Sequence, residues 1–205
     1  MRVRVGRMTR VLVGGVGYRN LRDHSFGVLL VDGLDVTGWP SGVSVEDISY
    51  NPIAVVQRLQ DDPPGQRFDL AVVAGAVQRP GRAPGTLSVY RWDNVLPSAE
   101  GIHEAVTEAV TGIISLDNTL VVARHFDALP ETVVVLELEP DAHEFGSALT
   151  PAVADALIQA RQLVTQLAFE PSAAELVPEG ALPDTRIRHT GVVFAKVFDG
   201  RPRIH

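Results

Sequence analysis

Short apolar runs alternate with longer stretches of helical periodicity along most of this chain, and this alternation restricts the folds that it can adopt. The runs suit buried strands, and three of them lie at residues 11–15, 68–77 and 132–140. The second, FDLAVVAGAV, is almost continuously apolar, as expected of a central strand covered on both faces. Strands separated by helices predict a mostly parallel sheet with helices on both sides.

Helix starts are marked at two places by a capping residue followed by proline. Asn51-Pro52 and Thr150-Pro151 both have this form, with proline at the first helical position. Apolar residues then recur with helical spacing, for example at Ile53, Val56 and Leu59. Further elements are expected as strands at residues 43–47 and 86–92, and as helices at residues 26–34, 102–113 and 119–126.

The length of 205 residues allows one sizeable core and is short for two domains. We predict a three-layer α/β domain of the phosphorylase/hydrolase type over residues 8–168, preceded by a ragged leader of seven residues. Residues 169–205 form a C-terminal extension that begins as a proline-containing linker without periodicity. Its apolar segment Val192–Phe198 is expected to pair as an edge strand or hairpin, because it would otherwise expose apolar side chains to water.

The composition excludes several classes of function. The formal net charge of −7 argues against nucleic acid or an acidic membrane surface as partner. The chain has no cysteine, which excludes disulfides, thiolate nucleophiles and sulfur-ligated metals. No apolar run approaches the roughly 20 residues of a membrane helix, and glycines interrupt the first apolar run too early for a signal peptide. These features predict a cytoplasmic protein.

The glycine turn in VLVGGVGYRNLRDHSFGV, residues 11–28, raises the question of phosphate binding. A strand, a glycine turn and a helix can hold a phosphate at the helix start. However, the dinucleotide pattern requires glycine where Asn20 stands, and the lysine of the Walker motif is absent. Asp23 would also repel a phosphate in front of the turn. A small-molecule binding module is therefore the least favoured interpretation.

The segment GVGYRNLRDHSFG, residues 15–27, resembles the opening motif of the hydrogenase maturation proteases. Gly15, Gly17, Asp23 and Gly27 fall on family positions without a gap. Three further segments are similar to family segments in the same order: FDLAVVAGAVQRPGRAPGTL, ARHFDALPETVVVLELEP and HEFGSALTPAVADAL. The resemblance covers about residues 9–167, and the chain after Ala168 has no counterpart.

The resemblance implies an α/β endopeptidase that removes a C-terminal extension from the precursor of a nickel–iron hydrogenase large subunit. That precursor is the implied partner. The nickel that it carries is recognised in the family by two acids and a histidine, residue types that suit a borderline divalent ion. No tightly bound cofactor is implied, and nickel is expected only as part of the substrate.

The site residues of this chain depart from the family pattern. The acidic pair after the first turn reads Asp23-His24, and the acid that ends the third strand is replaced by Gly75. The family histidine should fall near Ser115, where the nearest matching residue is Asp117, with His103 as an upstream alternative. We predict Asp23 and His24 as catalytic residues, His24, Asp23 and Asp47 as contacts to the metal, and Asp47, Asp117 and His103 as contacts to the substrate.

Other interpretations of these residues stay open. Asp23 could cap the following helix, because an acid there satisfies free amides. His24 could be a solvated loop residue, and surface or structural roles are equally open for His103, His125 and His143. The arginines of the RPGR segment, residues 79–82, could bind a peptide carboxylate, but arginines in loops usually face water. The missing acid at Gly75 favours a second function, that of a non-catalytic accessory or chaperone for hydrogenase assembly.

Overall fold

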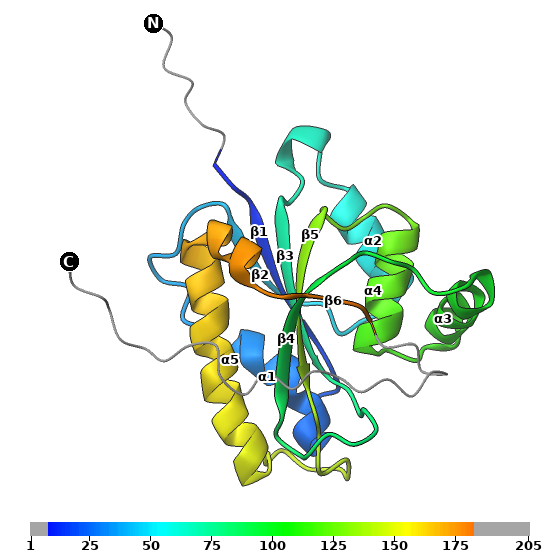
Figure 1. Ribbon diagram of the computed structural model, residues 1–205, viewed down its shortest axis with the longest axis vertical. Coiled ribbons are helices and arrows are strands. Elements are labelled where there is room, and N and C mark those ends of the chain that lie inside the picture. The colour runs from blue at the N-terminus through cyan, green and yellow to red at the C-terminus, as the bar shows by residue number, and fades with distance from the viewer. Residues whose placement is uncertain (1–7, 183–205) are drawn as a thin grey trace, which may run out of the picture.

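A computed structural model describes residues 8–182 as a six-stranded sheet between two layers of helices (Figure 1). The predicted three-layer α/β fold is confirmed. The strands are β1 Val11–Val16, β2 Val43–Asp47, β3 Leu70–Ala76, β4 Leu87–Trp92, β5 Thr132–Leu138 and β6 Glu179–Gly180. The helices are α1 Phe26–Asp32, α2 Pro52–Gln60, α3 Ala99–Thr111, α4 Leu116–His125 and α5 Pro151–Phe169, and the short 3-10 helices are η1 Arg22–Ser25, η2 Pro64–Gln66 and η3 Pro171–Leu176.

The strands follow the order β2-β1-β3-β5-β4-β6 across the sheet. The first four in this order are mutually parallel, whereas β4 runs antiparallel to β5 and parallel to β6. Every residue of β1 is buried, as are almost all residues of β3 and β5, which explains their continuous apolar sequences. Side chains of β4 alternate between buried and half-buried, which matches its alternating sequence.

Two apolar cores form because successive side chains of a strand point to opposite faces of the sheet. Leu12, Val73 and Val135 face the helices α2, α3 and α4. Their immediate neighbours on the same strands, such as Val13 and Val72, face α1 and α5. Figure 1 shows the two helix layers on opposite sides of the central strands.

The residues after α5 correct one expectation. The stretch interpreted as a linker forms η3 and β6 and packs against the domain. Ala174 and Val177 are buried in the core beside α5, and Glu179 pairs with Arg91 of β4. The predicted strand Val192–Phe198 and the seven-residue leader lie outside the described residues.

The described residues include no single helix with the length and apolar character of a membrane span. Helices α3 and α4 reach that length only when taken together, and they meet at an angle of 112°.

Candidate functional site

The end of β1 and the turn that follows it each have one position that is packed too tightly for any residue larger than glycine. A Cβ atom at Gly15 would lie 2.1 Å from the carbonyl oxygen of Gly27, and one at Gly17 would lie 2.4 Å from that of His24. Neither glycine has the positive φ of the left-handed region. Close backbone approach is therefore the reason for these glycines, and it fixes Asp23 and His24 against the end of β1.

Asp23 is fully buried, and its carboxylate connects η1 to the segment between β5 and α5. One oxygen, Oδ2, accepts hydrogen bonds from the backbone N–H of Asp141 at 3.0 Å, the N–H of Ala142 at 2.9 Å and the Thr150 hydroxyl at 2.9 Å. The other, Oδ1, accepts from the N–H of Thr150 at 2.8 Å. Burial raises the pKa of Asp23, but these hydrogen bonds outweigh it and hold the pKa below its ordinary value.

This arrangement gives Asp23 a positioning role in the fold, because both carboxylate oxygens accept hydrogen bonds from the chain itself. The catalytic and metal-contact roles of Asp23 stay predictions. The helix-cap alternative is wrong, because neither η1 nor α1 has a side-chain cap. Thr150 does not cap α5 with its side chain, since its hydroxyl is bonded to Asp23.

The imidazole of His24 is half-buried and lies beside that of His143, with ring centroids 6.3 Å apart and ring planes at 75°. Burial lowers the pKa of His24, and the nearby His143 lowers it further, whereas Asp23 opposes the shift. His24 is therefore neutral at neutral pH, the form in which an imidazole accepts a hydrogen bond or binds a metal ion.

Asp47 is held in a separate network at the end of β2. Its carboxylate accepts hydrogen bonds from Arg19 at 2.7 Å and from the backbone N–H of Ser49 at 3.0 Å. The same Arg19 also forms an ion pair with Asp32. Burial raises the pKa of Asp47, but the bonds from Ser49 and Arg19 outweigh it and lower the pKa overall.

Asp117, at the start of α4, forms a bidentate ion pair with Arg79. The two guanidinium nitrogens lie 2.8 Å and 2.7 Å from the carboxylate oxygens. Arg79 also donates to Glu137 of β5 at 2.7 Å, and Glu137 accepts further bonds from Arg82 at 2.6 Å and from the Tyr90 hydroxyl at 2.8 Å. We call Arg79, Arg82, Tyr90, Asp117 and Glu137 the charge network.

Burial and charge act in opposite directions within the charge network. Burial lowers the pKa of Arg79, but its two carboxylate partners outweigh this and raise it. Burial raises the pKa of Glu137, but the arginines and the Tyr90 hydroxyl hold it below its ordinary value. Burial and the charge of Glu137 both raise the pKa of Tyr90. Burial and the charge of Glu137 raise the pKa of Asp117, and Arg79 only partly offsets this. Glu137 and the guanidiniums are therefore ionised and the phenol is protonated.

Sequence reasoning missed Glu137 and Tyr90 and placed the loop arginines in water. In fact Arg79 is buried, as is Glu137. A signal was present in the strand TVVVLELEP, where a carboxylate interrupts a run that is covered on both faces. A buried charge requires a partner of opposite sign, and the nearby RPGR loop provides two arginines.

The predicted metal contacts do not converge. Within residues 8–182, no group of three or more His, Asp or Glu side chains is placed to hold a metal ion. Asp23, Asp47 and Asp117 belong to three separate hydrogen-bond networks, and His103 lies on an exposed face of α3. A Cβ atom at Gly75 would lie 3.1 Å from both Cβ of Leu116 and the carbonyl oxygen of Val16, so an acid there would require its neighbours to move.

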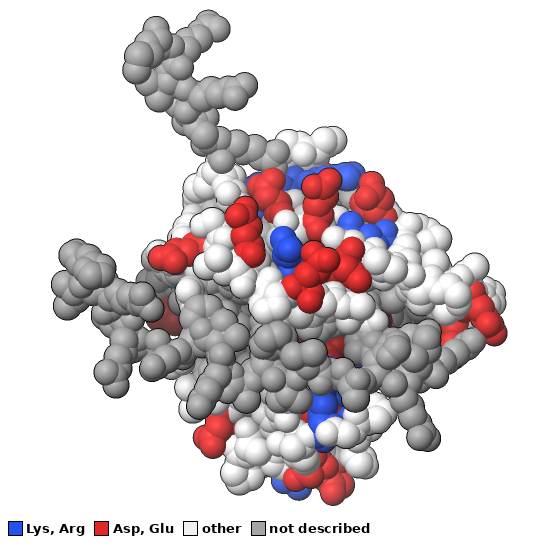
Figure 2. Space-filling model, viewed as in Figure 1, with Lys and Arg blue, Asp and Glu red and all other residues white. Residues whose placement is uncertain are grey.

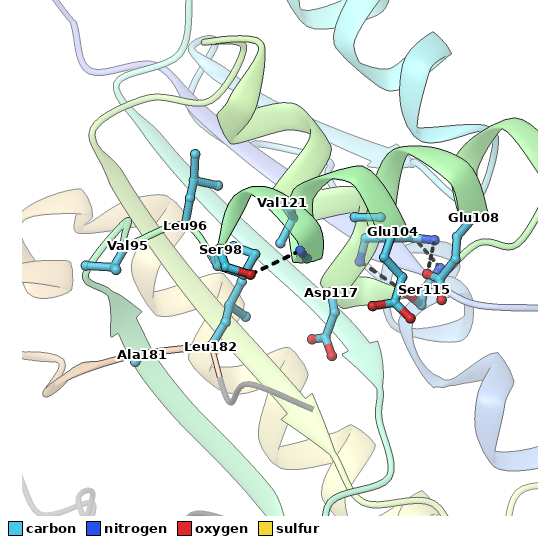
Figure 3. A pocket seen from close by; sticks show the side chains of 14 residues that line it. Val95, Leu96, Ser98, Glu104, Glu108, Ser115, Asp117, Val121, Ala181 and Leu182 are labelled. Carbon is cyan, nitrogen blue, oxygen red and sulfur yellow. Dashed lines mark hydrogen bonds between the residues drawn. The ribbon is translucent and has the colours of Figure 1, made fainter. Parts of the chain in front are cut away.

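A cavity of about 460 Å³ lies between the β4–α3 connection, α3 and the start of α4 (Figure 3). Its wall includes Leu96 and Leu182 on one side and Glu104 and Glu108 on the other, with Asp117 between them. We call this cavity the α3–α4 groove. Because Asp117 belongs to both, the groove meets the charge network at the first turn of α4.

Solved structures of hydrogenase maturation proteases share this fold, and they confirm the resemblance found in the sequence. The structure is similar to the hydrogenase maturating endopeptidase HybD from Escherichia coli, with 26% identity, a TM-score of 0.56, and coverage of 80% of this chain and 94% of HybD. It is also similar to the hydrogenase 2 maturation peptidase of a Thaumarchaeota archaeon, with 26% identity, a TM-score of 0.52, and coverage of 77% and 97%.

A further Escherichia coli endopeptidase shares the fold at 24% identity and a TM-score of 0.57, over 83% of this chain and 96% of that protein. No family model matches the chain, and no curated protein matches it in sequence.

Proposed function

We propose that this chain acts in nickel–iron hydrogenase maturation in the cytoplasm, as an endopeptidase-like protein that binds and removes the C-terminal extension of a large-subunit precursor. The observation that carries the proposal is the structural match to two maturation peptidases at 26% identity, over 80% and 77% of this chain. The nickel belongs to the precursor and enters this site as part of the substrate.

His24 is the residue best suited to contact that nickel. It is half-buried, and its imidazole is neutral at neutral pH, so that a ring nitrogen can bind a borderline divalent ion. Asp23 supports this role indirectly, because it fixes the loop that carries His143 next to His24. Asp117 lines the α3–α4 groove together with Glu104 and Glu108, so that a peptide bound in the groove would approach it.

A second candidate function is that of an accessory protein that binds the precursor without cutting it. Two observations favour it. The space beside Gly75 is filled by Leu116 and Val16, and the acid expected at that place in the family is missing. In addition, Asp117 is engaged by Arg79, so that it presents a neutralised carboxylate.

The two functions are separated by incubating the full chain with nickel-loaded and nickel-free precursor. Intact-mass spectrometry detects cleavage, and size-exclusion chromatography detects a complex. We expect the chain to act on the nickel-loaded precursor and His24→Ala to lose this activity. The control His125→Ala, on the last turn of α4, should behave as the wild type. A stable complex without cleavage would select the accessory function. The absence of both would refute the proposal.

A further inference from the structure

The α3–α4 groove has two chemically different walls. One is apolar, with Val95, Leu96 and Leu182. The other carries the carboxylates of Glu104 and Glu108 on α3. Its volume of about 460 Å³ lies within the range of ligand sites in proteins. A ligand that fits both walls must present apolar groups on one side and positive charge on the other.

The chain itself leads into this groove. Residues Glu179–Gly180 form β6 against β4, and backbone hydrogen bonds from Arg91 to Pro178 at 2.8 Å and from Asp93 to Gly180 at 2.9 Å fix their course. The next two residues, Ala181 and Leu182, line the groove directly. The described part of the chain therefore ends at the wall of the groove, at a point set by the sheet.

The sequence that follows carries charge of the sign opposite to that of the groove's acidic wall. Residues 183–205 contain five Lys or Arg against two Asp, a net charge of +3. Residues 8–182 contain ten Arg against 23 Asp or Glu, a net charge of −13. Acidic side chains also lie over α3, at the right of the view in Figure 2. Opposite charges on a body and its own tail favour their association.

The order of residues also matches the two walls. Successive side chains of an extended chain point to opposite sides. Arg186 and Arg188 would therefore share one side, and Ile187 would face the other. At 3.3–3.6 Å per residue, Arg186 lies at most about 14 Å along the chain from Leu182, which keeps it within reach of the groove.

We propose that residues 183–190 bind in the α3–α4 groove of their own chain. Arg186 and Arg188 face Glu104 and Glu108, and Ile187 packs on the apolar wall with Val95 and Leu96. Because this segment is covalently connected to β6, its effective concentration at the groove is of the order of millimolar. Binding can therefore occur even when each contact is weak. Any peptide from another protein must displace this segment to enter the groove.

Cysteine cross-linking of the full chain tests the proposal, because the natural sequence has no cysteine to interfere. Ile187→Cys is combined with Val95→Cys in the groove, where Val95 is 64% exposed. The control pair combines Ile187→Cys with Leu176→Cys, an exposed position on η3 that is closer in sequence but does not line the groove. The rate of intramolecular disulfide formation is measured by mass spectrometry under mild oxidation, after thermal melting has shown that each variant is folded.

We expect the groove pair to form its disulfide at least fivefold faster than the control pair. Glu104→Lys should slow disulfide formation in the groove pair about fivefold, as expected when a surface attraction becomes a repulsion. Adding Arg186→Glu should restore the rate, whereas Glu175→Lys on η3 should not change it. Equal rates for the two pairs, or a groove rate insensitive to both charge reversals, would overturn the proposal.

Discussion

Replacing Asp23 tests whether its carboxylate holds the β1–α1 turn against the segment between β5 and α5. The carboxylate accepts four hydrogen bonds, three of them from backbone N–H groups of the segment between β5 and α5. Each hydrogen bond to a charged group contributes about 1.5–3 kcal/mol, and the contributions within one cluster do not add fully. In Asp23→Asn the amide oxygen can replace Oδ2 and keep three bonds, while its NH₂ group then opposes the N–H of Thr150.

We expect Asp23→Asn to lower the free energy of unfolding by about 2–4 kcal/mol. Asp23→Ala should lower it by about 3–5 kcal/mol, because alanine leaves several N–H donors without an acceptor. Urea denaturation followed by circular dichroism measures both. The matched control is Asp155→Asn on the exposed side of α5, which should stay within about 0.5 kcal/mol of the wild type. A loss for Asp23→Asn no larger than that of the control would refute the reasoning.

The pH dependence of the same variant gives an independent check. The pKa of Asp23 is lower in the folded chain than its ordinary value of 3.8. A carboxylate of this kind stabilises the fold above the pKa of the unfolded state, and the stabilisation is lost as the pH falls through the folded pKa. The stability gap between wild type and Asp23→Asn should therefore be constant near neutral pH and should narrow below pH 3.8. Hydrogen exchange of residues 141–150 should be faster in the variant at neutral pH.

Three further predictions follow from neighbouring features. Glu137→Gln should lower the free energy of unfolding by about 3–5 kcal/mol in urea denaturation, because it leaves Arg79 and Arg82 short of a buried counter-charge, whereas the exposed Glu131→Gln should have little effect. Tyr90, whose folded pKa is raised, should stay protonated in an ultraviolet titration, and stability should fall as the pH rises above about 10, where the unfolded tyrosine ionises; loss of the Tyr90 proton in the folded chain at pH 10 would contradict this. Gly17→Ala should lower the melting temperature, because its Cβ atom would lie 2.4 Å from the His24 carbonyl oxygen, whereas Gly65→Ala meets nothing within 4 Å and should not; equal melting temperatures for the two variants would exclude the close approach as the reason for Gly17.

The sequence predicted the fold well because the signals for it are local. The strand at residues 43–47 and the cap at Asn51 depend on a few adjacent residues, and the structure confirms both, with the Asn51 side chain accepting from the N–H of Ile53 at 2.8 Å. Likewise, the continuous apolar sequence of β3 indicated that it is covered on both faces.

The site was harder to predict because its contacts join residues far apart in the chain. Asp23 is bonded to Thr150, 127 positions later, and Arg79 to Glu137, 58 positions later. The sequence identified Asp23 and Asp117 as candidate site residues, but it could not determine which donor each carboxylate faces. Asp23 and Asp117 were therefore assigned to substrate or metal, whereas the structure engages them with other parts of the same chain.

The charge network also has a consequence for how the sheet is assembled. The Tyr90 hydroxyl reaches Glu137 only in the observed alignment of β4 and β5, in which Tyr90 pairs with Val135 and Ser88 with Glu137. A slip of one residue would turn Tyr90 to the opposite face. Glu137 would then be a buried anion that has lost one of its donors, whereas a purely apolar strand would tolerate the slip more readily. The network therefore selects one alignment of the antiparallel strand during folding and rejects its near neighbours.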